Sequence, residues 1–252
     1  MLPVLSIAGS DPSGGAGIQA DLKTFLDHGT YGMAVLTALT AQNTAGVSAI
    51  HPVPLPFVAE QIRMVRADIP PRAIKIGMLG TADLVRTVAR ALADYDGPIV
   101  LDPVMVATSG ARLLEAEAER ALLTELVPRA TVLTPNLPEA QVLLGEEAPA
   151  DWARRTGIAL LLKDGHGEGQ QVVDRLFLPG GEVLDFAHPR IATRNTHGTG
   201  CTLSSALAAR LARGEGLAEA SRGAIAYVAA LVAASAGHEL GAGRGPLLHG
   251  RG

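Results

Sequence analysis

The feature that most constrains this 252-residue sequence is its regular alternation of short apolar runs with longer amphipathic stretches. Short apolar runs are typical of strands buried on both faces of a parallel sheet, and the amphipathic stretches between them are typical of covering helices. The pattern predicts an α/β fold with a central, mostly parallel sheet flanked by helices on both faces. The predicted strands span Pro3–Ala8, Gly32–Leu36, Ala73–Ile76, Pro98–Leu101, Ala130–Leu133 and Ile158–Leu162.

Helices are predicted between these strands. Gly29 and Gly145 follow two of them at the position where glycine commonly ends a helix. The predicted helices span Ile18–Asp27, Pro56–Ala67, Ala82–Ala93, Glu115–Leu126 and Leu137–Leu144.

The last third of the chain has a different pattern. Gln171–Leu178 and Glu182–Phe186 flank a Pro-Gly-Gly turn and predict a small β-hairpin late in the chain. Two alanine-rich helices are predicted at Thr199–Arg213 and Ala218–Ala236, followed by a glycine-rich tail without periodicity. Because no repeat or long linker divides the chain, we predict a single domain over residues 1–252.

Composition argues against several classes of partner. The formal net charge is −4, so the chain lacks the basic balance typical of nucleic-acid binding. The amino terminus has no basic segment ahead of its short apolar run, as a secretory signal would, and Cys201 is the only cysteine. We expect a cytoplasmic protein with no membrane or nucleic-acid partner.

The polar and glycine-rich clusters follow the predicted strands directly. They include Gly9-Ser-Asp, Gly77-Met78, Asp102-Pro, Thr134-Pro-Asn136 and Lys163-Asp-Gly. Ligands of open α/β sheets bind at the carboxyl ends of the strands, where such clusters converge. The sequence therefore predicts a small-molecule site at one edge of the sheet.

One motif in this region is misleading. Gly15, Gly17 and Ala20 match the dinucleotide-binding pattern G-x-G-x-x-A. However, Gly15 lies well beyond the end of the first strand, and no acidic residue follows the next strand, where one would bind the ribose. A nicotinamide-dependent oxidoreductase is therefore disfavoured. A P-loop is also absent, since no Gly-Lys-Ser/Thr follows a glycine at the required spacing.

The segment Asn195-Thr-His-Gly-Thr-Gly-Cys201 precedes a long predicted helix. Glycines there leave backbone N–H groups free to point at one anion, and the helix dipole adds positive potential. An ordinary helix start has the same spacing, so spacing alone leaves both interpretations open. Lys163 is one of only three lysines and follows an apolar strand, either as a strand-end cation or as a ligand of an anion.

Taken together, these motifs resemble the hydroxymethylpyrimidine kinases, a family with the ribokinase-like fold. Most ribokinase-like proteins have Gly-x-Gly-Asp at the helix start, whereas this family has Gly-Thr-Gly-Cys, as here at Gly198–Cys201. The resemblance extends over nearly the whole chain. It includes the segments Ala8–Lys23, Thr37–Thr44, Lys75–Gly80, Leu101–Met105 and Leu133–Ala140.

This resemblance implies a Mg²⁺- and ATP-dependent kinase of thiamine biosynthesis. It implies that Gly198, Thr199 and Gly200 hold the transferring phosphoryl group and that Cys201 acts as base. A cysteine can serve as base because its pKa, about 8.5 when free, is expected to fall at a helix N-terminus. It also implies ATP contacts from Lys163, Asn136 and Thr199, and Mg²⁺ ligands at Asp102 and Glu139; turn formation and a first-turn acid are the structural alternatives for these two.

The resemblance places the pyrimidine against Gln42, Asp21, Gly9, Met78 and Val104. The Gln42 amide offers an acceptor and a donor side by side, as the 4-amino group and the adjacent ring nitrogen require. Met78 and Val104 would form apolar walls, and Gly9 would allow close backbone approach.

The implied reaction has two steps: ATP phosphorylates the hydroxymethyl group, and a second ATP phosphorylates the monophosphate. The nearest alternative is a pyridoxine or pyridoxal kinase with the same fold, and a more distant one is a non-catalytic pyrimidine-binding regulatory domain. The family leads us to expect a homodimer. The segment from Arg190 to Thr196 is either a nucleotide-side flap or a plain connector.

Overall fold

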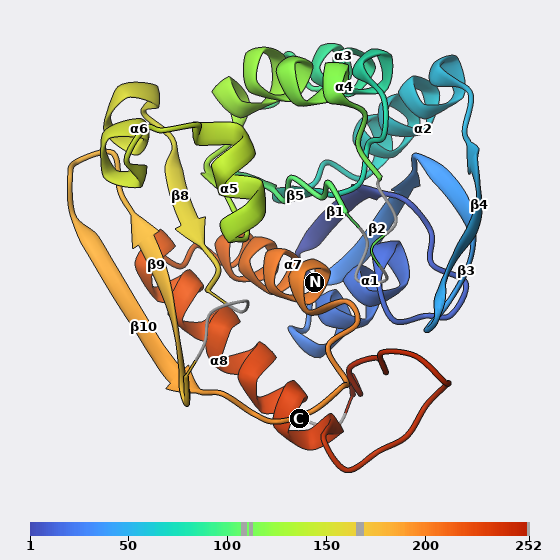
Figure 1. Ribbon diagram of the computed structural model, residues 1–252. Coiled ribbons are helices and arrows are strands. Elements are labelled where there is room, and N and C mark those ends of the chain that lie inside the picture. The colour runs from blue at the N-terminus through green and yellow to red at the C-terminus, as the bar shows by residue number, and fades with distance from the viewer. Residues whose placement is uncertain (107–109, 111–112, 165–168, 251–252) are drawn as a thin grey trace.

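An eight-stranded sheet forms the centre of the molecule (Figure 1). The computed structural model describes residues 1–106, 110, 113–164 and 169–250. The strand order is β10-β9-β8-β7-β6-β5-β1-β2, parallel from β8 to β2, with β9 and β10 as an antiparallel edge. These strands are β1 (Pro3–Ala8), β2 (Tyr31–Leu36), β5 (Ala73–Ile76), β6 (Ile99–Leu101), β7 (Val132–Leu133), β8 (Ala159–Leu162), β9 (Gln171–Phe177) and β10 (Val183–Pro189).

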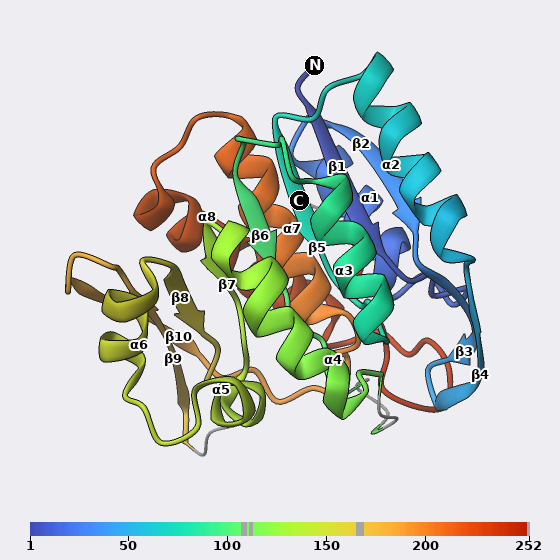
Figure 2. The ribbon, with the colours of Figure 1, turned by 90° about the horizontal axis from the view of Figure 1, so that it is seen from above.

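Helices cover both faces of this sheet (Figure 2). One apolar core joins the sheet to α2, α3, α4 and α6, and a second core joins it to α1, α7 and α8. The helices are α1 (Gly17–Asp27), α2 (Leu55–Asp68), α3 (Ala82–Ala91), α4 (Ala116–Ala121), α5 (Leu137–Leu144), α6 (Pro149–Thr156), α7 (Thr199–Ala212) and α8 (Leu217–Ser235).

The central strands are apolar on both sides because both faces are covered. In β1, Val4 packs into the core with α1 and α7, whereas Leu5 and Ile7 pack into the core with α2 and α3. All three side chains have no exposed surface. Because both faces of such a strand are buried, its sequence is nearly continuous in apolar residues instead of alternating apolar with polar ones.

The predicted α/β class is confirmed, with differences at the periphery. The predicted late hairpin forms, but it extends the main sheet rather than standing apart. A separate two-stranded sheet, β3 (Ala38–Asn43) and β4 (Gly46–Pro52), was not predicted, and neither was α6. The predicted helix Glu115–Leu126 forms as α4 followed by one π-helical turn over Leu122–Leu126.

By length and composition, α8 is the one described helix that is apolar enough to cross a membrane. Ala220, Ala224 and Ile225 of this helix are buried in the core that it shares with α7 and the sheet. These side chains pack inside the protein, and 28% of the apolar stretch is buried.

Candidate active site

The residues that follow the central strands meet at one edge of the sheet. Because β8, β7, β6 and β5 are parallel neighbours, their carboxyl ends lie side by side. Lys163, after β8, places its Nζ 3.0 Å from Oδ1 of Asp102, after β6. Thr134, after β7, donates to the same oxygen at 3.1 Å. The structure thus brings together the residues that the sequence pattern predicted to converge.

The turn at the start of α7 lies against this cluster. Gly198 has φ 82°, in the left-handed region that favours glycine, and a Cβ atom here would overlap the carbonyl oxygen of Gly15. A Cβ atom on Gly200 would lie 3.4 Å from Lys163 Nζ and 3.6 Å from Asp102 Oδ2. No side chain caps the helix; the Thr199 N–H makes a long bond of 3.4 Å to the Thr196 carbonyl, and the first-turn N–H groups have no intrahelical acceptor. We call residues 198–200 the anion turn.

The ammonium of Lys163 stays charged in this setting. Burial lowers its pKa, but the nearby carboxylates of Asp102 and Glu139 outweigh burial and raise the pKa above its usual value. The lysine therefore presents a fixed positive charge beside the anion turn, which suits a phosphate.

Glu139 has a structural role as well as a place in the cluster. Its side chain accepts from the backbone N–H of Asn136 at 2.9 Å, and the Asn136 side chain accepts from the backbone N–H of Glu139 at 2.9 Å. This reciprocal capping box begins α5. Glu139 is therefore a first-turn acid that caps α5, and this capping orients its carboxylate at the edge of the site.

Asp102 and Glu139 are both buried, and they fit a hard divalent cation. Burial raises the pKa of Glu139; Lys163 opposes this effect, and the neighbouring Asp102 carboxylate adds to it. Two buried carboxylates that repel each other are oxygen donors of the kind that Mg²⁺ prefers. Across the described part of the chain, no group of three or more acidic, histidine or cysteine side chains converges on a metal site.

Cys201 occupies the first turn of α7, and its predicted pKa shift is wrong. Burial raises the pKa of its thiol to about 11, although the Lys75 ammonium lowers it in part. Its place at the helix N-terminus suggested the opposite sign, but removal of the thiolate from water and the nearby carboxylates of Asp21 and Asp102 outweigh that effect. Cys201 is a thiol in the unliganded protein at neutral pH.

Asp21 is part of a fully buried network whose charge acts on this thiol. Lys75 Nζ is 2.9 Å from both of its carboxylate oxygens, and Ser6 and Ser205 donate to them at 2.5 and 2.7 Å. Burial lowers the pKa of Lys75, but the charge of Asp21 reverses this and raises it. The sequence singled out Asp21 but did not predict its pairing with Lys75. Direct contact between Asp21 and a substrate stays a prediction.

The residues predicted for the ring end lie on β3 and on the loops after β1, β5 and β6. Gln42 is half-buried on β3, where Thr40 Oγ1 lies 3.2 Å from its Oε1. A Cβ atom on Gly9 would lie 2.9 Å from Met78 Cε, so this glycine and Met78 are in close contact. Val104 is half-buried in the loop after β6.

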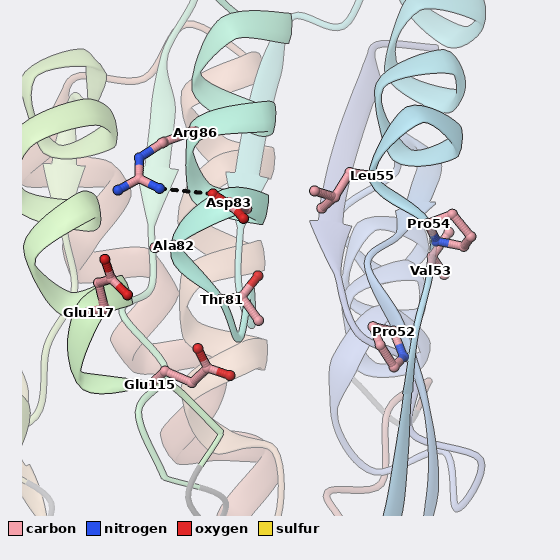
Figure 3. A pocket seen from close by; sticks show the side chains of 10 residues that line it. All are labelled: Pro52, Val53, Pro54, Leu55, Thr81, Ala82, Asp83, Arg86, Glu115 and Glu117. Atoms are coloured by element: carbon pink, nitrogen blue, oxygen red, sulfur yellow. Dashed lines mark hydrogen bonds and ion pairs between the residues drawn. The ribbon is translucent and has the colours of Figure 1, made fainter.

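Two cavities adjoin this end of the molecule. One, of about 510 Å³, has a mainly apolar lining that includes Met78, Thr37 and Leu79. The other, of about 520 Å³, shares part of this lining and has the Arg86–Asp83 ion pair in its wall (Figure 3). Both are lined by Pro52, Val53, Leu55, Thr81 and Glu115. The apolar cavity gives an aromatic ligand room beside Met78.

Comparisons with known proteins agree on one family. The model of the family described as phosphomethylpyrimidine kinase matches residues 11–248. The chain is 48% identical to the hydroxymethylpyrimidine/phosphomethylpyrimidine kinase of Rhizobium meliloti, over 97% of this chain and 96% of that protein. It is 47% identical to the thiamine biosynthesis bifunctional protein of Geobacter sulfurreducens, over 98% of this chain and 52% of that protein.

The fold also resembles that of a solved pyridoxal kinase. The structure of the pyridoxal kinase from Staphylococcus aureus in complex with ADP superposes with a TM-score of 0.89 and 33% sequence identity, over 99% of this chain and 94% of that one.

Proposed function

The chain belongs to the phosphomethylpyrimidine kinase family, and on this premise we propose that it phosphorylates 4-amino-5-hydroxymethyl-2-methylpyrimidine with ATP, first to the monophosphate and then to the diphosphate, in thiamine biosynthesis. The observation that carries the proposal is the junction of the anion turn with Lys163 and Asp102 at the carboxyl edge of the sheet. Phosphoryl transfer depends mainly on positioning and charge neutralisation, and this junction offers both.

At the phosphoryl end, the backbone N–H groups of Gly198, Thr199 and Gly200 would bind the oxygens of the transferring group. Lys163 would neutralise charge on the ATP phosphates, and the Asn136 side chain and the Thr199 hydroxyl would add hydrogen bonds. Because the first-turn amides are aligned before the ligand arrives, they need no reorganisation in the transition state.

Asp102 and Glu139 would hold Mg²⁺, in part through water. The ion would neutralise phosphate charge as the transfer proceeds. Lys163 shares the Asp102 carboxylate in the unliganded protein. Binding of the metal and ATP would therefore redirect the lysine towards the phosphates.

At the acceptor end, Cys201 would accept the proton of the substrate hydroxyl as the new O–P bond forms. The raised pKa means that the thiolate is a minor species at neutral pH, so this step should accelerate with pH. In the second step, the acceptor is an anionic phosphate oxygen, which carries no proton that must be removed. We propose that Cys201 serves the first transfer only.

Gln42 would read the aminopyrimidine edge, and Met78, Val104 and Gly9 would enclose the ring. Asp21 is supported as an electrostatic partner of Lys75, because its carboxylate already accepts hydrogen bonds from Lys75, Ser6 and Ser205. We propose that residues 1–252 act as one domain that assembles as a homodimer in the cytoplasm.

Pyridoxal phosphorylation is the second candidate, favoured by the structural likeness to the pyridoxal kinase of Staphylococcus aureus. The two proposals differ only in the acceptor. ATP consumption should therefore be measured with the pyrimidine alcohol and with pyridoxal in parallel, each with Mg²⁺ and again after chelation by EDTA. Turnover of the pyrimidine that EDTA abolishes and Mg²⁺ restores supports the pyrimidine assignment and the requirement for Mg²⁺, and turnover of pyridoxal alone rejects the pyrimidine assignment.

A further inference from the structure

His197 directly precedes the anion turn and joins three distant parts of the chain. It is buried, with 5% of its surface exposed. Its Nε2 lies 2.7 Å from Oδ2 of Asp11, in the loop after β1, and 3.5 Å from Nε2 of Gln42, on β3. Its backbone N–H donates to the carbonyl oxygen of Gly245, in the tail, at 3.0 Å.

Asp11 determines which ring nitrogen of His197 carries the proton. Although burial opposes ionisation, hydrogen bonds from His197 and Ser13 lower the pKa of Asp11 to about 2, so the acid is a carboxylate at neutral pH. The backbone N–H groups of Ser13 and Ala16 also donate to it, at 2.9 and 2.8 Å. A carboxylate only accepts hydrogen bonds, so the Nε2 atom of His197 must be protonated and donate to it.

This tautomer affects Gln42. A protonated Nε2 cannot accept a hydrogen bond from the Gln42 NH₂ group, although the two nitrogens are 3.5 Å apart. The Thr40 hydroxyl has one proton, and it lies closer to the carbonyl oxygen of Ser10, at 2.8 Å, than to Gln42 Oε1, at 3.2 Å. The Gln42 NH₂ group therefore finds no acceptor in His197, and its protons remain available to a ligand.

The tail holds the β3–β4 hairpin in the same arrangement. The backbone N–H of Arg244 donates to the carbonyl oxygen of Thr44, in the hairpin turn, at 3.1 Å. One residue further on, Gly245 accepts from His197. The tail thus connects His197, through backbone hydrogen bonds, to the hairpin that carries Gln42.

We propose that Asp11 and His197 are a positioning pair: Asp11 fixes the Nε2-protonated tautomer of His197, and His197, held in this way and tied through Gly245 to the tail that binds the β3–β4 hairpin, keeps Gln42 in place for the acceptor ring. Neither residue needs to touch the reacting atoms. The proposal rests on the proposed function only for the identity of the acceptor ring.

The test compares two nearly isosteric variants, His197→Gln and His197→Met. The glutamine retains an N–H donor near the Nε2 position, and the methionine does not. We expect His197→Gln to remain within about threefold of the wild type in kcat/KM for the pyrimidine. His197→Met should lose about tenfold or more through a raised KM for the pyrimidine, with the KM for ATP changed by less than about twofold. Asp185→Asn, in an exposed ion pair on β10, is the surface control and should leave these constants unchanged.

A purely structural role would affect both variants alike and would alter the KM values of both substrates. Equal losses in the glutamine and methionine variants at equal melting temperature, or a KM for ATP that rises as much as that for the pyrimidine, would overturn the proposal.

A second measurement is independent of the substrate's identity. In ¹⁵N-histidine spectra of the unliganded wild type, the His197 signal, identified by its loss in His197→Gln, should show a proton on Nε2, and Asp11→Asn should change that signal. An unprotonated Nε2 would overturn the pair even if the pyrimidine is the substrate. If only pyridoxal is turned over, the pyrimidine assignment fails. The positioning pair is then tested by the same comparison of KM values with pyridoxal as the acceptor.

Discussion

Replacement of Cys201 by alanine should separate the two phosphoryl transfers. The first acceptor is a neutral hydroxyl that must lose a proton, and general base catalysis typically contributes about 10²- to 10⁴-fold to such a step. The second acceptor is already an anion. We therefore expect Cys201→Ala to slow monophosphate formation by about 10²-fold or more and to slow diphosphate formation, started from added monophosphate, by less than about fivefold.

The raised pKa of Cys201 also predicts how steeply the rate of the first transfer depends on pH. Because burial raises the pKa of Cys201 to about 11, roughly one molecule in three thousand carries the thiolate at pH 7.5. The rate of the first transfer should then rise about tenfold per pH unit from pH 7 to pH 10, and it should level off only as the pH approaches the pKa. Cys201→Ala should lose this slope.

The assay is a single-turnover time course with each acceptor, with products separated by chromatography, from pH 6.5 to 10. Cys201→Asp is the informative companion, because a carboxylate base ionises at lower pH and should flatten the profile of the first step. Equal losses in both steps, or a wild-type first step that is flat with pH while chemistry limits the rate, would refute the role of Cys201.

Three further predictions concern the phosphate end and the tail. Gly198→Ala should reduce turnover of both acceptors by about 10²-fold or more, because a Cβ atom would overlap the Gly15 carbonyl, whereas Gly216→Ala, at a position with open space, should retain wild-type kinetics. Lys163→Met should lower kcat/KM for ATP by about 10²-fold, with a smaller effect on the KM for the pyrimidine. Steady-state kinetics with each substrate varied in turn test this, and an equal loss for ATP and for the pyrimidine would contradict it. Gly243→Ala should destabilise the fold by about 1 to 3 kcal/mol, a loss of several degrees in Tm, because its Cβ atom would overlap the Thr44 carbonyl; Gly237→Ala has free space, and thermal melts that shift equally for both would refute this account.

The central strands could be predicted because their physical setting leaves a local signature. β1 and β5 have the predicted bounds, Pro3–Ala8 and Ala73–Ile76, and both are mainly apolar, with one buried polar residue each, Ser6 and Lys75. β3 and β4 escaped prediction because their residues are largely half-buried or exposed and show neither a clear apolar run nor strict alternation. The short helix α6 buries only Trp152 and Ala153, too few residues to mark a period of 3.6.

The site was predictable where it depends on strand ends and not where it depends on long-range contacts. Lys163 and Asp102 converge because parallel neighbours must end at the same edge. Asp11 and His197 are 186 residues apart and lie in loops, where no periodicity reports a contact. Both residues stand inside the segments that carry the family resemblance, but only the fold reveals that they form a pair. The family resemblance itself is confirmed by the family model and by relatives that match along almost the whole chain.

The most direct test of the account is a product-resolved time course with 4-amino-5-hydroxymethyl-2-methylpyrimidine, ATP and Mg²⁺, run beside an identical reaction with pyridoxal. We predict that the pyrimidine monophosphate appears first and then declines as the diphosphate accumulates, with two ATP consumed per pyrimidine, and that kcat/KM for the pyrimidine exceeds that for pyridoxal. A pyrimidine reaction that consumes no ATP, while pyridoxal is phosphorylated, would contradict the account at its centre.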